Sequence, residues 1–143
     1  WETAQGGEYF ASGVGGAITG RGADLLIIDD PHSEQDAMNM TALERAYEWY
    51  TSGPRQRLQP GGAIVCVMTR WNTKDLTGML LEHQKEAKSD QWELIEFPAI
   101  MPSGKPVWPE YWNIHTVLPN IYQLWRKRMQ KCILLVFHIK QNI

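Results

Sequence analysis

The stretch LLIIDDP at residues 25–31 decides the fold, because it joins four consecutive apolar residues to two acids and a proline. An apolar run with β-branched members and no alternation is typical of a strand buried on both faces of a parallel sheet. Pro31 cannot continue the hydrogen bonds of such a strand. The stretch therefore predicts a buried strand at Leu25–Ile28, with Asp29 and Asp30 at its carboxyl end.

Further apolar runs and amphipathic stretches alternate along the chain after this strand. They predict strands at Ala63–Met68 and Trp92–Phe97, a turn at Gln59–Gly62, and helices at about Ala42–Tyr50 (cap Thr41) and from a Thr73 cap to about Ala87. The order strand, helix, strand, helix, strand predicts an α/β fold with a largely parallel sheet flanked by helices. In such sheets the chemistry lies at the carboxyl ends of the strands.

The composition is that of a soluble globular protein, with 43% hydrophobic residues, 21% charged residues and a net charge of −2. The length of 143 residues fits one domain or part of one. Every apolar run is shorter than the roughly 18 residues that span a bilayer, so no membrane is expected as a partner. Cys66 and Cys132 lie in apolar runs without a CxxC motif, which indicates buried thiols in a reducing cytosol. The seven tryptophans are not interleaved with basic residues, which favours packing over base stacking.

The two acids after the first strand match a Walker B pattern. In such a pattern the first carboxylate, here Asp29, serves a Mg²⁺ held against nucleotide phosphates, and the second, Asp30, orients or deprotonates the attacking water. The second acid is usually Glu, so Asp30→Glu is expected to be tolerated. The pattern alone is weak, because many buried strands end in an Asp that stabilises the next turn.

Three other residues are candidates for a nucleotide site. Thr69 and Arg70 follow the neighbouring strand, where a hydroxyl group could sense the γ-phosphate; Thr69 could equally be a strand former and Arg70 a solvated charge. Arg21 lies between two glycines and could contact a phosphate, reach the nucleotide of a neighbouring subunit, or form part of a surface turn. No G-x-x-x-x-G-K-[ST] loop occurs in the chain. A metal site at Asp29-Asp30-Pro31-His32 is a weaker alternative.

As an ordered set, these residues resemble the ATPase domain of phage terminase large subunits. The resemblance covers roughly residues 6–112 and is carried by Gly13–Pro31, Glu44-Arg45, Trp49-Tyr50, Arg57-Leu58, Pro60–Ile64, Thr69–Trp71, Asp75-Leu76, Phe97–Ala99 and Trp108–Glu110. Each piece is common alone, and the order makes the set specific.

The resemblance implies a partial P-loop ATPase domain of the additional-strand class at residues 1–112. It implies ATP and Mg²⁺ as cofactors, with Asp29 serving the metal, Asp30 the water, Thr69 and Arg70 the coupling motif, and Arg21 a phosphate. The implied partners are double-stranded DNA, the portal protein, the small terminase subunit and further copies in a ring. The implied location is the host cytoplasm at the procapsid portal. A Walker A segment and a nuclease domain would lie outside the chain, which would then be inactive alone.

Residues 113–143 form a basic tail without resemblance to the family. The stretch from Ile114 onward holds five Lys or Arg and no acid, which is typical of a reading-frame shift, a gene break or a divergent lineage. We expect this tail to stay outside the sheet, although Ile133–Ile139 is apolar enough for a strand. Two other functions stay open: another P-loop motor such as a helicase, and a DNA- or protein-binding remnant without activity.

Overall fold

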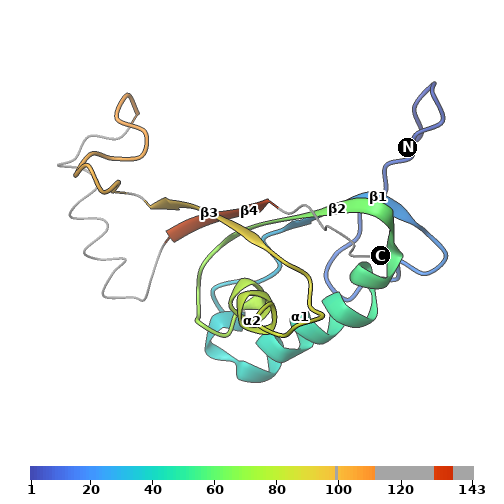
Figure 1. The fold of residues 1–143 in the computed structure, drawn as a ribbon, viewed down its shortest axis with the longest axis horizontal. Coiled ribbons are helices and arrows are strands. Elements are labelled where there is room, and N and C mark those ends of the chain that lie inside the picture. The colour runs from blue at the N-terminus through green and yellow to red at the C-terminus, as the bar shows by residue number, and fades with distance from the viewer. Residues whose placement is uncertain (99, 112–130, 137–143) are drawn as a thin grey trace.

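A computed structural model describes residues 1–98 and 100–111, together with the backbone of residues 131–136. The elements in chain order are β1 (Ala23–Asp29), η1 (Asp36–Met38), α1 (Met40–Ser52), η2 (Pro54–Arg57), β2 (Leu58–Thr69), α2 (Leu76–His83), β3 (Glu93–Pro98) and β4 (Lys131–Val136). The chain is thus a mixed α/β structure in which helices alternate with the first three strands (Figure 1). No helix in these described ranges is long and apolar enough to cross a bilayer.

The described strands form one sheet in the order β1-β2-β4-β3. β1 pairs with β2 in parallel, whereas β4 is antiparallel to both β2 and β3. The first three strands therefore run in the same direction, as predicted. The prediction of a largely parallel sheet is correct in part, because β4 separates β2 from β3 and makes two of the neighbouring pairs antiparallel.

The position of β4 contradicts the prediction that the tail stays outside the sheet. Residues 131–136 lie between β2 and β3, with pairs that run from Val65–Val136 to Thr69–Cys132 on one side. On the other side the pairs run from Glu93–Val136 to Pro98–Lys131. The sequence offered no obvious partner strand for this apolar run, but residues 131–136 pair with β2 on one side and β3 on the other. The rest of the tail lies outside the described residues.

The helices lie where predicted, but their caps differ. Asn39 caps α1 by accepting a hydrogen bond from the amide of Ala42, two residues before the predicted cap at Thr41. Asp75, rather than Thr73, caps α2 by accepting from the amide of Gly78 at 2.9 Å. This second helix ends at His83, earlier than predicted, because turns follow from residue 84 onward.

The segment around Gly61 also differs from the prediction of a turn, because β2 begins at Leu58 and continues through it. Its register against β1 shifts between Ala23 and Leu25, so a bulge occupies this part of the ladder. Gly61 has a φ of +81°, a conformation that side-chain-bearing residues seldom adopt. The irregular glycines therefore form a bulged extension of the strand.

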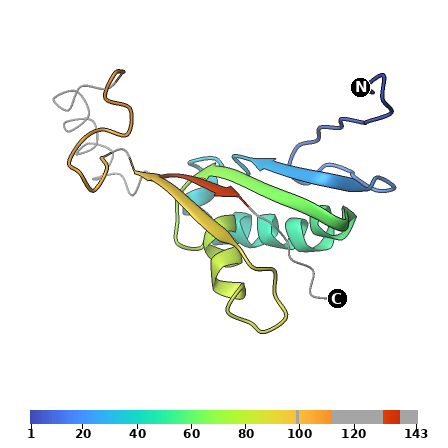
Figure 2. The ribbon, with the colours of Figure 1, turned by 45° about the horizontal axis from the view of Figure 1, so that its top comes forward.

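Both helices lie on the same face of the sheet (Figures 1 and 2). On this face Ile28, Ile64 and Cys66 form the core with Tyr50 of α1 and Leu76 of α2. Crossovers that progress in one direction across a sheet lie on one side, because β-α-β units are right-handed.

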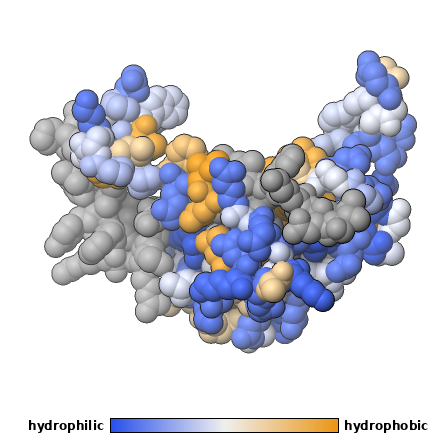
Figure 3. Space-filling model, viewed as in Figure 1, coloured by the Kyte–Doolittle hydropathy of each residue, from blue (hydrophilic) through white to orange (hydrophobic). Residues whose placement is uncertain are grey.

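On the opposite face Leu25 and Ile27 of β1 remain 55% and 58% exposed. Leu94 and Phe97 of β3, whose side chains point to opposite faces of the sheet, are also 41% and 43% exposed, and Figure 3 shows hydrophobic surface where this strand passes. The sheet is thus covered by helices on one face, whereas the sequence predicted that the first strand, β1, is buried on both faces.

Candidate functional site at the carboxyl ends of β1 and β2

The two acids and Thr69 lie side by side, because β1 and β2 are parallel neighbours and end at the same edge of the sheet. Asp29 is in register with Val67, and the amide of Asp30 donates to the Val67 carbonyl at 2.8 Å. The amide of Thr69 donates to Oδ1 of Asp30 at 3.0 Å. The sequence predicted this proximity from two separate strand ends. The hydrogen bond between the Thr69 amide and the Asp30 side chain could not be predicted from any local sequence pattern.

Asp30 has an unusual backbone for a residue with a side chain. Its φ is +39°, and no other described non-glycine residue has a positive φ. Asp and Asn tolerate the left-handed region better than other residues, because their short polar side chains bond to nearby backbone. Here that bond is to Thr69, so the side chain stabilises the turn that ends β1.

Arg70, predicted to take part in coupling, is bound within the protein. Its Nε donates to Oδ2 of Asp75 at 2.8 Å, and its Nη2 donates to the Asn72 carbonyl at 3.1 Å. The side chain is only 15% exposed. Its guanidinium therefore holds the loop between β2 and α2 in shape.

Asp75 is the centre of a buried polar cluster that the sequence analysis did not identify. Its side chain is fully buried, and its oxygens accept from Arg70 and from the amides of Trp71, Asn72 and Gly78. These four donors satisfy the hydrogen-bonding capacity of the buried carboxylate. A Cβ on Gly78 would collide with the Thr73 carbonyl, so the glycine allows the loop to pack closely. We call Asp75 and these donors the Asp75 cluster.

The loop after β1 is hydrogen-bonded to the first residue of α2. Nε2 of His32 accepts a hydrogen bond from the amide of Leu76 at 2.9 Å. Burial lowers the pKa of His32, and the nearby Asp75 and Asp36 carboxylates partly offset this effect. The imidazole is therefore neutral at pH 7, as an acceptor at Nε2 requires.

A further hydrogen bond joins the two loops directly. The Asn72 side-chain amide donates to the carbonyl of Ala37 in η1 at 2.8 Å. With the His32 bond, it fixes the loop after β1 against the loop after β2. The two strand ends that carry Asp30 and Thr69 are thus held by the first turn of α2.

The alternative metal site at Asp29-Asp30-Pro31-His32 has no support from this geometry. Nε2 of His32 already accepts a hydrogen bond from the Leu76 amide, and the residue is only 5% exposed. In the part of the chain that the structure describes, no group of three or more His, Cys, Asp or Glu side chains could hold a metal ion by itself. A metal here would need ligands from a bound molecule or from water.

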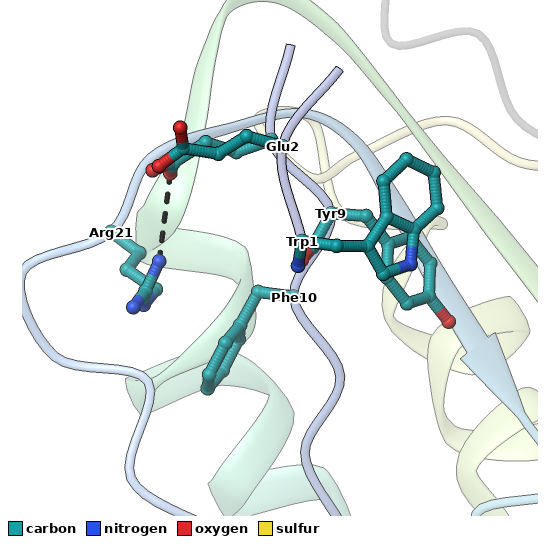
Figure 4. Close-up of a pocket in the computed structure, with 6 residues that line it drawn as sticks. Trp1, Glu2, Tyr9, Phe10 and Arg21 are labelled. Carbon is teal, nitrogen blue, oxygen red and sulfur yellow. Dashed lines mark hydrogen bonds and ion pairs between the residues drawn. The ribbon is translucent and has the colours of Figure 1, made fainter.

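Arg21 lies apart from the acids, because it precedes β1 whereas they follow it. β1 lies between them, and its extended chain from Ala23 to Asp29 spans about 20 Å. Arg21 lies over the ring of Phe10, with its Cζ 4.4 Å from the ring centroid, and its Nη1 is 3.5 Å from Oε2 of Glu8 (Figure 4). With Trp1, Glu2 and Tyr9, these residues line an open pocket of about 360 Å³. Within this chain Arg21 does not join the site of the acids.

A second pocket, of about 320 Å³, lies where α1, α2 and the segment before β3 meet. Arg55 donates to Asp90 through both Nε and Nη2, the latter at 2.7 Å from Oδ1. The Tyr50 hydroxyl is buried without a hydrogen-bond partner in the described structure, and burial raises its pKa. This pocket lies on the helical side of the sheet and shares no residue with the strand-end site.

The site at the carboxyl ends of β1 and β2 therefore consists of Asp29, Asp30 and Thr69, held by the Asp75 cluster and His32. Of the residues predicted from the sequence, Asp29, Asp30 and Thr69 lie together in the structure. Arg70 belongs to the Asp75 cluster, and Arg21 contacts Glu8 away from this site. The sequence did not predict that Asp75 and His32 support the site, because a helix cap and a buried histidine have no distinctive local pattern. Comparisons with models of protein families, with curated proteins and with solved structures gave no match to this chain.

Proposed function

We propose that this chain is a segment of the ATP-hydrolysing motor of a DNA-packaging terminase large subunit. The observation that carries the proposal is the juxtaposition of two carboxylates and a threonine at adjacent parallel strand ends. In this reading the segment belongs to a P-loop domain of the additional-strand class, which uses ATP and Mg²⁺. Its partners are double-stranded DNA, the portal, the small terminase subunit and further copies in a ring, in the host cytoplasm.

The residues present could supply some, but not all, of the ligands of a Mg²⁺ ion. Mg²⁺ is often bound through one or two carboxylates, with waters and substrate phosphates completing the shell. Asp29 is exposed at the sheet edge and offers one such carboxylate. Bound Mg²⁺ would neutralise charge on the phosphates of ATP.

Asp30 is suited to a different role. One of its oxygens, Oδ1, accepts from the Thr69 amide, so Oδ2 is the oxygen available to orient a water molecule. A shift of the Thr69 backbone would move this carboxylate, because a single hydrogen bond of 3.0 Å joins them. This link gives a physical basis for coupling between the end of β2 and the hydrolytic water.

Metal binding by the chain itself tests the proposal. Mn²⁺ replaces Mg²⁺ at many oxygen sites, and its paramagnetism broadens the NMR signals of nearby amides. We expect Mn²⁺ to broaden the amides of Asp29, Asp30 and Thr69 first, with ATP increasing the effect. Asp29→Asn should remove this preference, whereas Glu44→Gln, which changes an exposed carboxylate on α1, should not. Broadening that is uniform over exposed carboxylates would contradict the assignment.

ATP turnover distinguishes the possible functions. The chain contains no G-x-x-x-x-G-K-[ST] loop, so we expect no measurable hydrolysis by these 143 residues alone. In a polypeptide that joins this segment to such a loop, Asp30→Asn should abolish kcat and leave ATP binding intact. Stimulation by single-stranded rather than double-stranded DNA would favour the helicase alternative. If Mn²⁺ shows no preference for Asp29, Asp30 and Thr69, and neither the chain alone nor the joined polypeptide hydrolyses ATP, an inactive remnant would be favoured.

A further inference from the structure

Strand β4 occupies an internal position in the sheet although it comes last among the described elements. It pairs with Val65–Thr69 of β2 on one side and with Glu93–Pro98 of β3 on the other. We call the space between these two segments the strand slot. Figures 1 and 2 show β4 between the two strands.

The strand slot follows from how β2 and β3 are connected. These strands run in the same direction, and α2 lies in the connection between them, yet they do not pair with each other. They stand one strand apart, so each offers a row of amide and carbonyl groups toward the other. Such groups need partners when they are shielded from water. The slot therefore accepts one extended segment, paired on both sides.

The connection to β4 is far longer than the geometry requires. Pro98 and Lys131 are paired neighbours at the same end of the sheet, and a hairpin of 2–5 residues commonly joins such positions. Here residues 99–130 lie between them. An extended chain spans up to roughly 3.3 Å per residue, so this connection is long enough to extend beyond one molecule.

We propose that two copies of this chain exchange their C-terminal strands, each placing Lys131–Val136 in the strand slot of the other. Every pairing of β4 with β2 and β3 is preserved in the exchanged form, so the dimer gives up no ladder hydrogen bonds. The exchange is reciprocal and closes on itself as a twofold dimer. It does not depend on the ATPase assignment, because it uses only the backbone pairing of the sheet.

Protein concentration controls which form is populated. Because β4 is covalently joined to the rest of the chain, the chain's own strand stays near the slot at an effective concentration on the order of 1 mM. Refolding at about 10 µM should therefore give the monomer. Refolding at about 1 mM should trap a large share of exchanged dimer, which converts back only through unfolding of the sheet.

A cross-link between register partners distinguishes exchange from ordinary association. Val67 of β2 pairs with Leu134 of β4. We place Val67→Cys and Leu134→Cys together in a Cys66→Ala, Cys132→Ser background, refold at both concentrations, separate the fractions by gel filtration and oxidise each. We expect a disulfide within one chain in the monomer and between two chains in the dimer. The matched controls carry Val67→Cys or Leu134→Cys alone, and their dimer fractions should yield at least ten-fold less covalent dimer.

Three outcomes would overturn the proposal. One is a dimer fraction whose cross-link lies within single chains, and another is a covalent-dimer yield in the single-cysteine controls equal to that of the pair. The third is measured on the unmodified chain, in case the variants fold poorly. After refolding at about 1 mM, gel filtration should resolve a fraction whose mass by light scattering is twice 16.4 kDa, and monomer alone under that condition would refute exchange.

Discussion

Asp75→Ala should destabilise the fold more than a change at any exposed acid. The substitution removes the acceptor of three backbone amides and of the Arg70 guanidinium. Arg70 is 15% exposed and would remain as a largely buried charge without its carboxylate. Breaking a buried ion pair by removing one partner costs about 3–5 kcal/mol. Loss of the helix cap is part of the same change, so we expect a total of about 4 kcal/mol.

Urea unfolding followed by tryptophan fluorescence and far-UV circular dichroism measures this loss. Glu34→Ala, at an exposed acid, is the matched control and should leave the midpoint unchanged. In the double variant Arg70→Met/Asp75→Ala, part of the loss should be recovered, because no uncompensated charge remains. A loss below about 1 kcal/mol for Asp75→Ala, or strict additivity in the double variant, would refute the assigned role of the cluster.

Three further predictions concern Asp30, His32 and Cys66. Asp30→Asn should keep the stability of the wild type, because Asn tolerates the positive φ and can still accept from the Thr69 amide, whereas Asp30→Ala should cost about 1 kcal/mol in urea unfolding. In the same stability measurement Asp30→Glu should behave like Ala, since the added methylene displaces the carboxylate from that amide, and wild-type stability in the Glu variant would contradict this. Burial in the folded chain holds the pKa of His32 below its ordinary 6.5, so the unfolded chain binds more protons near that pH. The contribution of His32 to stability should therefore be complete above pH 6.5 and fall as the pH drops below it. His32→Gln should flatten that part of the pH profile of stability, measured by thermal unfolding. Burial raises the pKa of the Cys66 thiol to about 12, so in a Cys132→Ser background a soluble disulfide reagent at pH 8 should label Cys66 only after unfolding, and rapid labelling of the native chain would show that the core is open.

The sequence predicted those elements whose signals are local. The apolar runs at Leu25–Ile28 and Ala63–Met68 lie inside β1 and β2, and the stripe at Ala42–Tyr50 lies inside α1. The two strand ends could be placed together because parallel neighbours end at one edge of a sheet. These inferences needed only the periodicity of the chain and the rule for β-α-β units.

The errors concern interactions between distant or competing residues. Thr73 and Asp75 are both good caps, and the return of Arg70 onto Asp75 is what selects the second. The partners of residues 131–136 lie far away in the sequence, so no local pattern could reveal the strand slot. Arg21 is close to the acids in sequence, but β1 lies between them, and an extended strand places its two ends far apart.

The placement of both helices on one side of the sheet has a calorimetric consequence. Unfolding raises the heat capacity in proportion to the apolar surface that becomes hydrated, at about 12–15 cal/mol/K per residue for well-covered domains. For 143 residues this would be about 1.7–2.1 kcal/mol/K. Leu25 and Ile27 are already more than half hydrated in the native sheet, so they add little to the increment. The chain should therefore have a heat-capacity change below this range and a correspondingly flatter dependence of stability on temperature.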